Sequence, residues 1–335
     1  MAELNNISLE GYDCVEMIAG DYKAILAPGI GNNIIRLRNE AENIDVFRHD
    51  EEHPYTTVLN NPETYGYPFL YLPNRLDEGR LRTSDAVYHL PINEEGPFYN
   101  AIHGFLHKRA YKVIKSNVID DDTVTVVSEF KYDENDEFYQ YFPVAFTVRM
   151  TFTLSAKDGL LQNVEMRNDS KVMLPVGFCS HTAFQVPFID GTDPKDYFLS
   201  VPVTERWEIN NRCLPTEKVR DLTEYDMRYN EGTMPVTRGL DNDLYSAGMN
   251  SLNGQEFYGS YAVHKPTNKK VCYEVSQLYR FWCVWNDRGE NGYFCPEPCT
   301  WIINAPNLDT PKNRTGYWEI KPDEVYECWQ HITIQ

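Results

Sequence analysis

The feature that most restricts the fold of this chain is a strict alternation of apolar and polar side chains in AFTVRMTFTL, residues 145–154. Every second residue from Phe146 to Leu154 is apolar, and Thr or Arg stands at each position between them. Successive side chains of a β-strand point to opposite faces, so a period of two predicts a strand with one buried face. The rest of the chain must supply the sheet that surrounds this strand.

A second strand is predicted directly after the first. SAKDG, residues 155–159, has the composition of a turn, and the chain continues as LLQNVEMRNDS, residues 160–170. Val164 and Met166 in this segment fall on the same parity, as expected for an apolar face that continues across a hairpin. An antiparallel sheet follows from that pairing.

Further strand-length runs are bounded by Gly, Pro, Asn or Asp, and they lie at residues 23–39, 121–133 and 316–335. Helical patterns are few and short. The best candidate is TEKVRDLTEYDM, residues 216–227, although it lacks a sustained apolar stripe. We therefore predict an all-β fold, a large antiparallel β-sandwich. Strand patterns continue to residue 335 without a repeat or a linker, so we expect one domain over residues 1–335.

Charge and composition exclude several classes of function. The 50 acidic and 31 basic residues give a formal charge of -19, which repels phosphate backbones and anionic lipid surfaces. We therefore expect no nucleic-acid partner and no membrane partner. The first residues, MAELNNISLEGYD, contain neither a basic start nor an apolar run, so we expect a cytoplasmic protein.

The eight cysteines do not form a metal-binding pattern. Only Cys295 and Cys299 lie close together, and neither a second cysteine pair nor a nearby histidine completes a tetrahedral zinc site. Reduced thiols are expected in such a chain. The sequence thus predicts no metal and no cofactor.

Four segments place a polar residue among aromatic and turn-forming residues, as a sugar pocket on a β scaffold requires. The residues concerned are Arg75 beside Asn74, His103 with His107, His181, and Glu297 between Pro296 and Pro298. A carboxylate and an imidazole can serve as general base and general acid near neutral pH, and arginine can stabilise charge on oxygen.

Each candidate also has a simpler interpretation. His181 could be a core histidine bonded to backbone, and Glu297 a solvated turn carboxylate. Arg75 could pair at the surface with Asp77 or Glu78. The ordered combination favours a functional site over these alternatives, whereas His107 alone keeps the simpler interpretation of a loop histidine.

The order and spacing of these motifs resemble the aldose 1-epimerase (galactose mutarotase) family. An Asn-Arg near residue 75, a His-Gly at 103–104, a His-Thr-x-Phe at 181–184 and a late Glu-Pro at 297–298 match its series of motifs, as do GNNIIRL and YFPVAFTVRMTFTL. The resemblance covers nearly the whole chain. It implies the antiparallel supersandwich of galactose mutarotases, with a sugar in a cleft and no metal or nucleotide.

The resemblance also assigns roles to individual residues. Glu297 would be the general base and His181 the general acid, while His103 and Arg75 would bind the sugar. A sugar-binding aspartate would come from LDNDLYS, and either Asp241 or Asp243 fits that place.

Two departures point to a divergent branch of this family that includes hexose-phosphate mutarotase-like proteins. Ala183 stands where many members have tyrosine, and the Trp-Asn-x and Cys-Pro-Glu-Pro segments are also typical of that branch. Two aromatic residues have alternative interpretations: Trp282 and Trp285 could stack on a sugar or pack in the core as part of a strand.

The predicted function is therefore interconversion of the α and β anomers of a neutral aldohexose, with a small sugar as the partner and the oligomeric state left open. One alternative is the same chemistry on a hexose 6-phosphate, with Arg75, Arg80 or Arg82 binding the phosphate. Another is a non-catalytic carbohydrate-binding or regulatory protein. A paired acid and base disfavours the latter, because binding alone does not require both.

Overall fold

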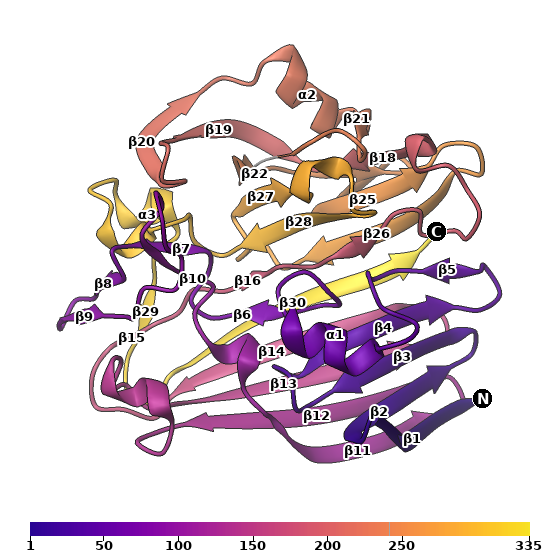
Figure 1. Ribbon diagram of the computed structural model, residues 1–335, viewed down its shortest axis with the longest axis horizontal. Coiled ribbons are helices and arrows are strands. Elements are labelled where there is room, and N and C mark those ends of the chain that lie inside the picture. The colour runs from indigo at the N-terminus through magenta and orange to yellow at the C-terminus, as the bar shows by residue number, and fades with distance from the viewer. Residues whose placement is uncertain (241) are drawn as a thin grey trace.

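Antiparallel strands dominate the structure, a computed structural model that describes residues 1–240 and 242–335 (Figure 1). The larger of the two main sheets has nine strands, in the order β11 (Lys112–Asp120), β12 (Thr123–Tyr132), β13 (Phe146–Ser155), β14 (Gly159–Asn168), β30 (Val325–Ile334), β26 (Lys269–Val275), β25 (Gly259–His264), β18 (Tyr197–Ser200) and β21 (Met234–Pro235).

The second main sheet carries most of the residues that we discuss below. Its strands follow the order β20 (Pro215–Arg220), β19 (Val203–Ile209), β22 (Asp243–Ala247), β27 (Phe281–Trp285), β28 (Tyr293–Cys299), β16 (Cys179–Ser180) and β6 (Phe69–Leu70), and β17 (Phe184–Gln185) also pairs with β28. A third sheet is formed by β1 (Ala2–Leu9), β2 (Tyr12–Ala19), β3 (Tyr22–Ala27), β4 (Asn33–Asn39) and β5 (Ile44–Asp45).

Short strand pairs and helices complete the described residues. The pairs are β7 (Arg75–Asp77) with β10 (Asn100–Ile102), β8 (Arg80–Arg82) with β9 (Val87–His89), β15 (Leu174–Pro175) with β29 (Glu319–Ile320), and β23 (Asn250–Leu252) with β24 (Gln255–Phe257). The α-helices are α1 (Pro54–Asn60), α2 (Glu224–Asn230) and α3 (Lys312–Thr315), and the 3-10 turns are η1 (Leu106–Lys108), η2 (Glu137–Gln140), η3 (Pro194–Asp196), η4 (Asp287–Gly289) and η5 (Ala305–Asn307).

The predicted hairpin is confirmed, and so is the antiparallel β-sandwich. β13 pairs with β14 in the register Leu154↔Leu160, and the alternating apolar residues of β13 are fully buried. Val164 and Met166 of β14 lie in the same core, as the shared parity predicts.

β30 occupies the middle of the nine-stranded sheet. It pairs with β14 on one side, where Cys328 faces Val164, and with β26 on the other, where Ile332 faces Tyr273. Figure 1 shows this yellow strand running between the two halves of the molecule. Strands distant in the sequence are thereby joined into one sheet.

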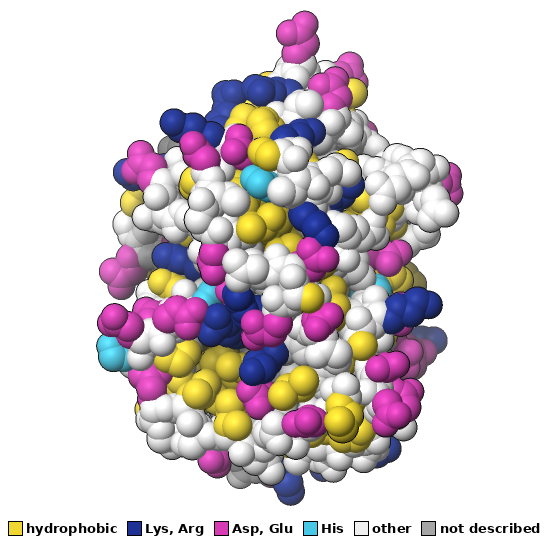
Figure 2. Space-filling view, turned by 90° about the vertical axis from the view of Figure 1, so that its right-hand side faces the viewer, with side chains coloured by type: hydrophobic (Ala, Val, Ile, Leu, Met, Phe, Trp, Pro, Cys, Tyr) yellow, Lys and Arg dark blue, Asp and Glu magenta, His cyan; other side chains and the backbone are white. Residues whose placement is uncertain are grey.

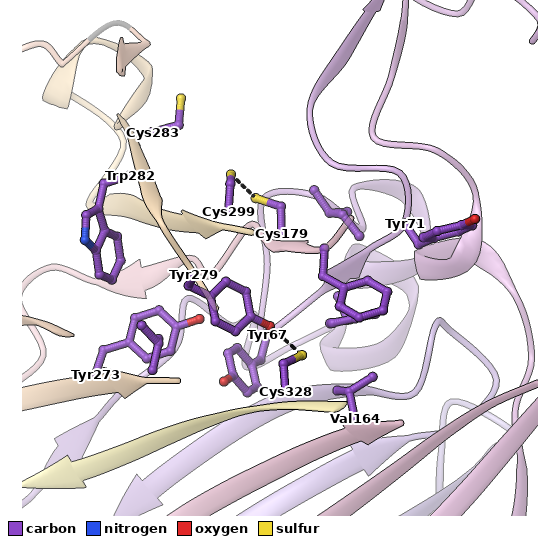
Figure 3. Packing of buried hydrophobic residues seen from close by; sticks show 14 of the residues in the cluster. Tyr67, Tyr71, Val164, Cys179, Tyr273, Tyr279, Trp282, Cys283, Cys299 and Cys328 are labelled. Carbon is purple, nitrogen blue, oxygen red and sulfur yellow. Dashed lines mark hydrogen bonds between the residues drawn. The ribbon is translucent and has the colours of Figure 1, made fainter. Parts of the chain in front are cut away.

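The sheets pack against each other through large buried side chains. β1 to β3 contact β11 to β13, and Tyr273 of β26 meets Trp282 of β27 edge to face at 6.2 Å between ring centroids. Figure 3 shows the tyrosines and cysteines of this layer between the two main sheets. One continuous core cluster extends from Val15 to Ile332.

A buried glutamine on β30 links this layer to the second sheet. The Gln330 amide nitrogen lies 2.8 Å from Ser180 Oγ, 3.1 Å from Gln162 Oε1 and 2.9 Å from the Tyr279 hydroxyl. Tyr273 donates to the Gln330 carbonyl. Because Gln330 is fully buried, these partners replace the water that its amide would otherwise bind.

The helix expected over residues 216–227 is wrong in its first half. Residues 215–220 form β20 at the edge of the second sheet, and α2 begins only at Glu224. Thr223 caps this helix, because its hydroxyl accepts from the Asp226 amide while the Asp226 carboxylate accepts from the Thr223 amide. The capping box sets the helix start, and the preceding residues gain more from pairing with β19.

Figure 2 shows acidic and basic side chains interspersed over one face, with no block of a single charge. Among the described residues, no helix is long and apolar enough to cross a membrane. The expectation of a single domain over residues 1–335 stays a prediction.

Truncating the central strand should weaken the fold strongly. Phe152→Ala empties a fully buried site on β13, and we expect the free energy of unfolding to fall by about 3–5 kcal/mol. Thr151→Ala, on the other face of the same strand, should cost about 1 kcal/mol or less. Urea unfolding followed by circular dichroism would measure both, and equal losses would contradict the assignment of the buried face.

Candidate functional site

A cleft of about 400 Å³ contains four of the residues singled out in the sequence: Arg75, His103, His181 and Glu297. They come from β7, from the loop after β10, from the loop between β16 and β17, and from β28. The volume lies in the range of small-molecule sites, roughly 300–1,000 Å³. The structure therefore brings together groups that are more than 200 residues apart in the sequence.

Glu297 is held at the buried end of this cleft. It sits in β28 opposite Cys283 of β27, and only 2% of its surface is exposed. Pro296 and Pro298 on either side have fixed φ angles, which limits the freedom of the backbone that carries this carboxylate. The side chain is thus fixed in position before any ligand arrives.

His181 is in direct contact with Glu297. Its Nε2 lies 3.2 Å from Glu297 Oε1, and the backbone amide of His181 donates to the Pro68 carbonyl at 3.1 Å. Trp285 and His103 meet the imidazole edge to face, at 5.6 Å and 5.2 Å between ring centroids. The imidazole is therefore fixed on several sides, while its Nδ1 makes no hydrogen bond within the described residues.

The surroundings of Glu297 determine how readily it accepts a proton. Burial raises the pKa of its carboxyl above the ordinary value, and the charges of His181 and Arg75 oppose this rise only in part. Its other donors are weak: the Asn74 amide at 3.5 Å and the Cys179 thiol at 3.9 Å, both to Oε2. Glu297 is consequently a stronger base than a solvated glutamate.

The backbone on one wall of the cleft is strained. Asn74 and His103 both have left-handed φ angles, 50° and 64°, and the His103 amide donates to the Asn74 carbonyl at 2.8 Å. Gly104 follows with a φ of 58°, and a Cβ there would lie 2.0 Å from the Tyr71 carbonyl oxygen. Only glycine fits this close approach. Strained residues of this kind concentrate at functional sites.

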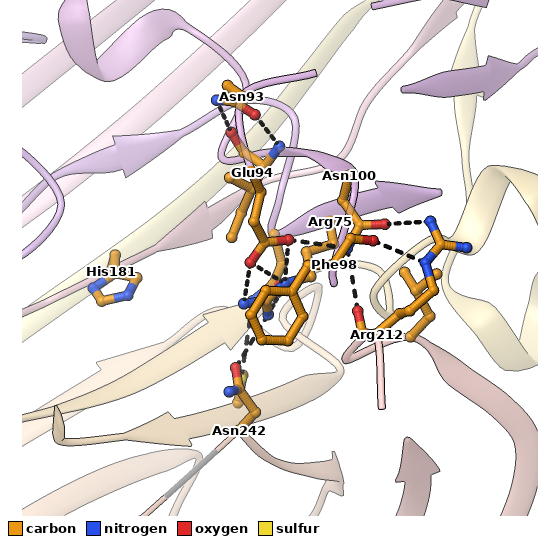
Figure 4. Close-up of polar contacts among 12 residues, drawn as sticks. Arg75, Asn93, Glu94, Phe98, Asn100, His181, Arg212 and Asn242 are labelled. Carbon is orange, nitrogen blue, oxygen red and sulfur yellow. Dashed lines mark hydrogen bonds and ion pairs between the residues drawn. The ribbon is translucent and has the colours of Figure 1, made fainter. Parts of the chain in front are cut away.

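Arg75 does not make the surface pair with Asp77 or Glu78 that the sequence allowed. It is 8% exposed, and its Nη2 and Nε donate to Glu94 at 2.8 Å and 3.0 Å (Figure 4). Its Nη1 donates to Asn242 Oδ1 at 3.1 Å. The guanidinium is thereby fixed at the cleft, facing the side that holds His181.

The two aspartates proposed for sugar binding have different outcomes. Asp241 lies outside the described residues. Asp243 points away from the lining of the cleft: its carboxylate accepts from Arg206 at 2.6 Å and from the Tyr225 and Tyr229 hydroxyls at 2.9 Å and 3.0 Å. Its neighbour Asn242 lines the cleft instead.

The sequence analysis missed Glu63, Lys108 and Asn242, which also line the cleft. Glu63 belongs to the loop between α1 and β6, which carries no recognisable motif. The HGFLHK segment, residues 103–108, was the only sequence indication of these residues, because its His107 and Lys108 both contact Glu63. Of the two tryptophans considered, Trp285 lines the cleft and Trp282 is buried in the core.

Potential metal ligands gather elsewhere. Within the described part of the chain, three such residues come together at Asp45, His49 and Glu51. Arg36 already donates to Asp45 at 3.1 Å and to Glu51 at 2.8 Å, so the carboxylates are neutralised by a cation of the chain itself. This group lies outside the cleft lining.

Comparison with known proteins agrees with this architecture. The family model of aldose 1-epimerase matches residues 13–333. The crystal structure of a galactose mutarotase-like protein from Clostridium acetobutylicum is 30% identical, with a TM-score of 0.94, and the match covers 100% of this chain and 98% of that one. A galactose 1-epimerase from Lactobacillus acidophilus NCFM, 11% identical with a TM-score of 0.73 over 100% and 98% of the two chains, shares the fold.

A curated relative matches over a shorter segment. The plasmid protein LacX of Lactococcus lactis subsp. lactis is 25% identical over 149 residues. This segment is 44% of the present chain and 46% of LacX, so less than half of that relative is matched.

The contacts of Asp243 predict a structural contribution to stability. Asp243→Asn removes the charge that faces Arg206, and we expect a loss of about 2–3 kcal/mol in the free energy of unfolding. Asp121→Asn is the matched control, because Asp121 is exposed in the turn between β11 and β12 and its substitution should change stability by about 0.5 kcal/mol or less. Thermal or urea unfolding that ranks the two variants in the opposite order would contradict this role.

Proposed function

Because the chain belongs to the aldose 1-epimerase family, we propose that it is a mutarotase, which interconverts the α and β anomers of a neutral aldohexose by opening and reclosing the sugar ring. The observation that carries this proposal is the contact between Glu297 and His181, a buried carboxylate and an imidazole 3.2 Å apart in a preformed cleft. Two such groups suffice for the reaction, because the sugar is neither oxidised nor reduced. One proton leaves the anomeric hydroxyl and another is added to the ring oxygen.

The geometry suits the two ends of a single step. The anomeric hydroxyl and the ring oxygen are bonded to the same carbon, C1, so the groups that act on them must be close neighbours. Glu297 accepts the proton of the anomeric hydroxyl while His181 donates one to the ring oxygen, and the bond between C1 and the ring oxygen breaks. An open-chain aldehyde results.

Rotation about the bond from C1 to C2 then exposes the other face of the aldehyde. Reclosure reverses both proton transfers, with Glu297 now the acid and His181 the base, and the other anomer leaves. The raised pKa of Glu297 assists both halves of the cycle, because a base whose pKa is nearer to neutrality also returns its proton more readily.

His103 and Arg75 bind and polarise the sugar oxygens. Burial lowers the pKa of His103 well below its ordinary value, and the neighbouring His181 and His107 add to this effect, so the ring is neutral at pH 7 and can donate one hydrogen bond. Arg75 contributes a fixed positive charge beside Glu297.

The charges around the cleft favour a neutral sugar over a phosphorylated one. Arg75 pairs with Glu94 and Lys108 pairs with Glu63, so each cation of the cleft already faces a carboxylate. Arg80 and Arg82, the other phosphate-binding candidates from the sequence, are absent from the lining of this cleft. A phosphate dianion would need at least one of these arginines or lysines free of its partner.

Polarimetry tests the substrate class directly. We expect the protein to accelerate equilibration of freshly dissolved α-D-galactose or α-D-glucose and to have little effect on the corresponding 6-phosphates. The rate should survive treatment with EDTA, because the proposed step uses only side chains. Preference for a 6-phosphate would replace the proposed substrate, and loss on chelation with recovery on adding a divalent ion would contradict the mechanism.

Substitution of the paired groups tests the mechanism. Glu297→Gln and His181→Asn should each lower kcat by about 10²- to 10⁴-fold while sugar binding largely persists, because both replacements keep the shape and remove proton transfer. The double variant should lose less than the product of the single losses. Cys295→Ala is a suitable control, since Cys295 is buried in the same strand but does not line the cleft.

The dependence of kcat/KM on pH belongs to the same experiment. Since the folded protein raises the pKa of Glu297, the acidic limb of the wild-type profile should lie above the ordinary range of a glutamate, and activity should fall as the pH drops through it. Glu297→Gln should lack that limb. Unchanged turnover in either single variant would remove that residue from the mechanism.

A further inference from the structure

We propose that Glu63 is a substrate-binding residue that accepts a hydrogen bond from a hydroxyl group of the sugar other than the anomeric one, and that it selects neutral aldoses against sugar phosphates. This inference rests on the proposed function and extends it to a residue without a recognisable motif. Glu63 lies in the loop between α1 and β6 and shares the cleft lining with His103, His181 and Glu297.

The Glu63 carboxylate is held by two donors from one short turn, η1. His107 Nε2 and Lys108 Nζ both lie 2.9 Å from Glu63 Oε1. Both contacts use Oε1, so within residues 1–240 and 242–335 Oε2 keeps its lone pairs for a ligand. The Glu63 side chain is 27% exposed at the cleft, whereas that of His107 is 1% exposed behind it. A buried donor thus holds an accessible acceptor in place.

Glu63 differs from Glu297 in its protonation. Burial raises the pKa of the Glu63 carboxyl, but the hydrogen bonds and charges of His107 and Lys108 outweigh burial and hold that pKa well below its ordinary range. Burial lowers the pKa of His107, and the hydrogen bond and charge of Glu63 oppose that shift only in part. Glu63 therefore remains an acceptor at any pH at which Glu297 could act as a base.

A permanently ionised acceptor recognises hydroxyl groups, which can donate, and repels phosphate oxygens, which at neutral pH mostly cannot. Glu297 and His181 engage the two oxygens on C1, so Glu63 is left for a hydroxyl farther along the sugar. Asp243 does not supply this acceptor, because its carboxylate is occupied by Arg206 and two tyrosines. Glu63, in contrast, lines the cleft.

The test compares wild-type protein with Glu63→Gln on D-galactose and its 2-, 3-, 4- and 6-deoxy derivatives. We expect Glu63→Gln to lower kcat/KM for D-galactose about tenfold or more, chiefly through KM, since a charge-assisted hydrogen bond is lost. For one of the deoxy sugars, kcat/KM of the wild type should fall by a similar factor relative to D-galactose. The same deoxy sugar should lower kcat/KM of Glu63→Gln little further, because both changes delete the same contact. The preference for D-galactose over D-galactose 6-phosphate should also shrink in the variant.

Glu51→Gln is the matched control, because Glu51 also accepts from a histidine and a cation, His49 and Arg36, but lies outside the cleft lining. Equal effects of Glu63→Gln and Glu51→Gln on kcat/KM would overturn the inference. So would a result in which the loss from Glu63→Gln multiplies in full with the loss from every deoxy sugar. Should Glu63→Gln fail to fold, Glu63→Asp, which keeps the charge on a shorter side chain, undergoes the same comparison.

Calorimetric titration with D-galactose separates this inference from the proposed function. A wild type that binds the sugar without accelerating its equilibration would refute the mutarotase proposal, and weaker binding by Glu63→Gln would still support the role of Glu63. Wild-type turnover together with unchanged kinetics in Glu63→Gln would refute the role of Glu63 alone. A wild type that neither binds nor turns over an aldohexose would refute both.

Discussion

The site depends on one buried amide, that of Gln330 in β30. Its nitrogen lies within hydrogen-bond distance of Ser180, Gln162 and Tyr279, and its oxygen accepts from Tyr273. A buried amide that loses such a partner costs about 1–3 kcal/mol, and the contact with Ser180 of β16 ties the nine-stranded sheet to the second main sheet. Ser180 is the residue that connects Cys179 and His181, both of which touch Glu297. The position of the imidazole relative to the carboxylate is therefore inherited from the packing of the sheets.

The cleft gives its carboxylates opposite properties by means of their neighbours. Glu297 is surrounded by poor donors, a thiol and a distant amide, and burial dominates its pKa. Glu63 contacts a lysine, and its pKa shifts the other way. Glu94 serves neither proton transfer nor ligand recognition, because its carboxylate forms an ion pair with Arg75. Pairs of acidic groups whose environments push their pKa values apart are a recurring way to divide labour within one site, here between proton transfer and ligand recognition.

Sequence patterns were informative where a physical rule is local. The alternation in residues 145–154 predicted β13, its buried face and its hairpin with β14, because side-chain direction in a strand depends on residue parity alone. The helix prediction is wrong for residues 216–220, since their pairing with β19 at the edge of the sheet outweighed their local helical preference. The cleft position of Glu63 and the ion pair of Asp243 could not be predicted, because each depends on the distant residue, His107 or Arg206, that lies opposite it after folding.

The central place of β30 has a consequence for the order in which the sheet assembles. Its partners β14 and β26 precede it by about 165 and 60 residues, so the middle of the nine-stranded sheet stays open until the last of the described strands has been synthesised. Contacts between such distant segments fold slowly, and the two unpaired strand edges are exposed in the meantime. A chain stalled before β30 would hold every residue that lines the cleft and yet lack Gln330, leaving the strands beneath the cleft to associate with other chains or with chaperones.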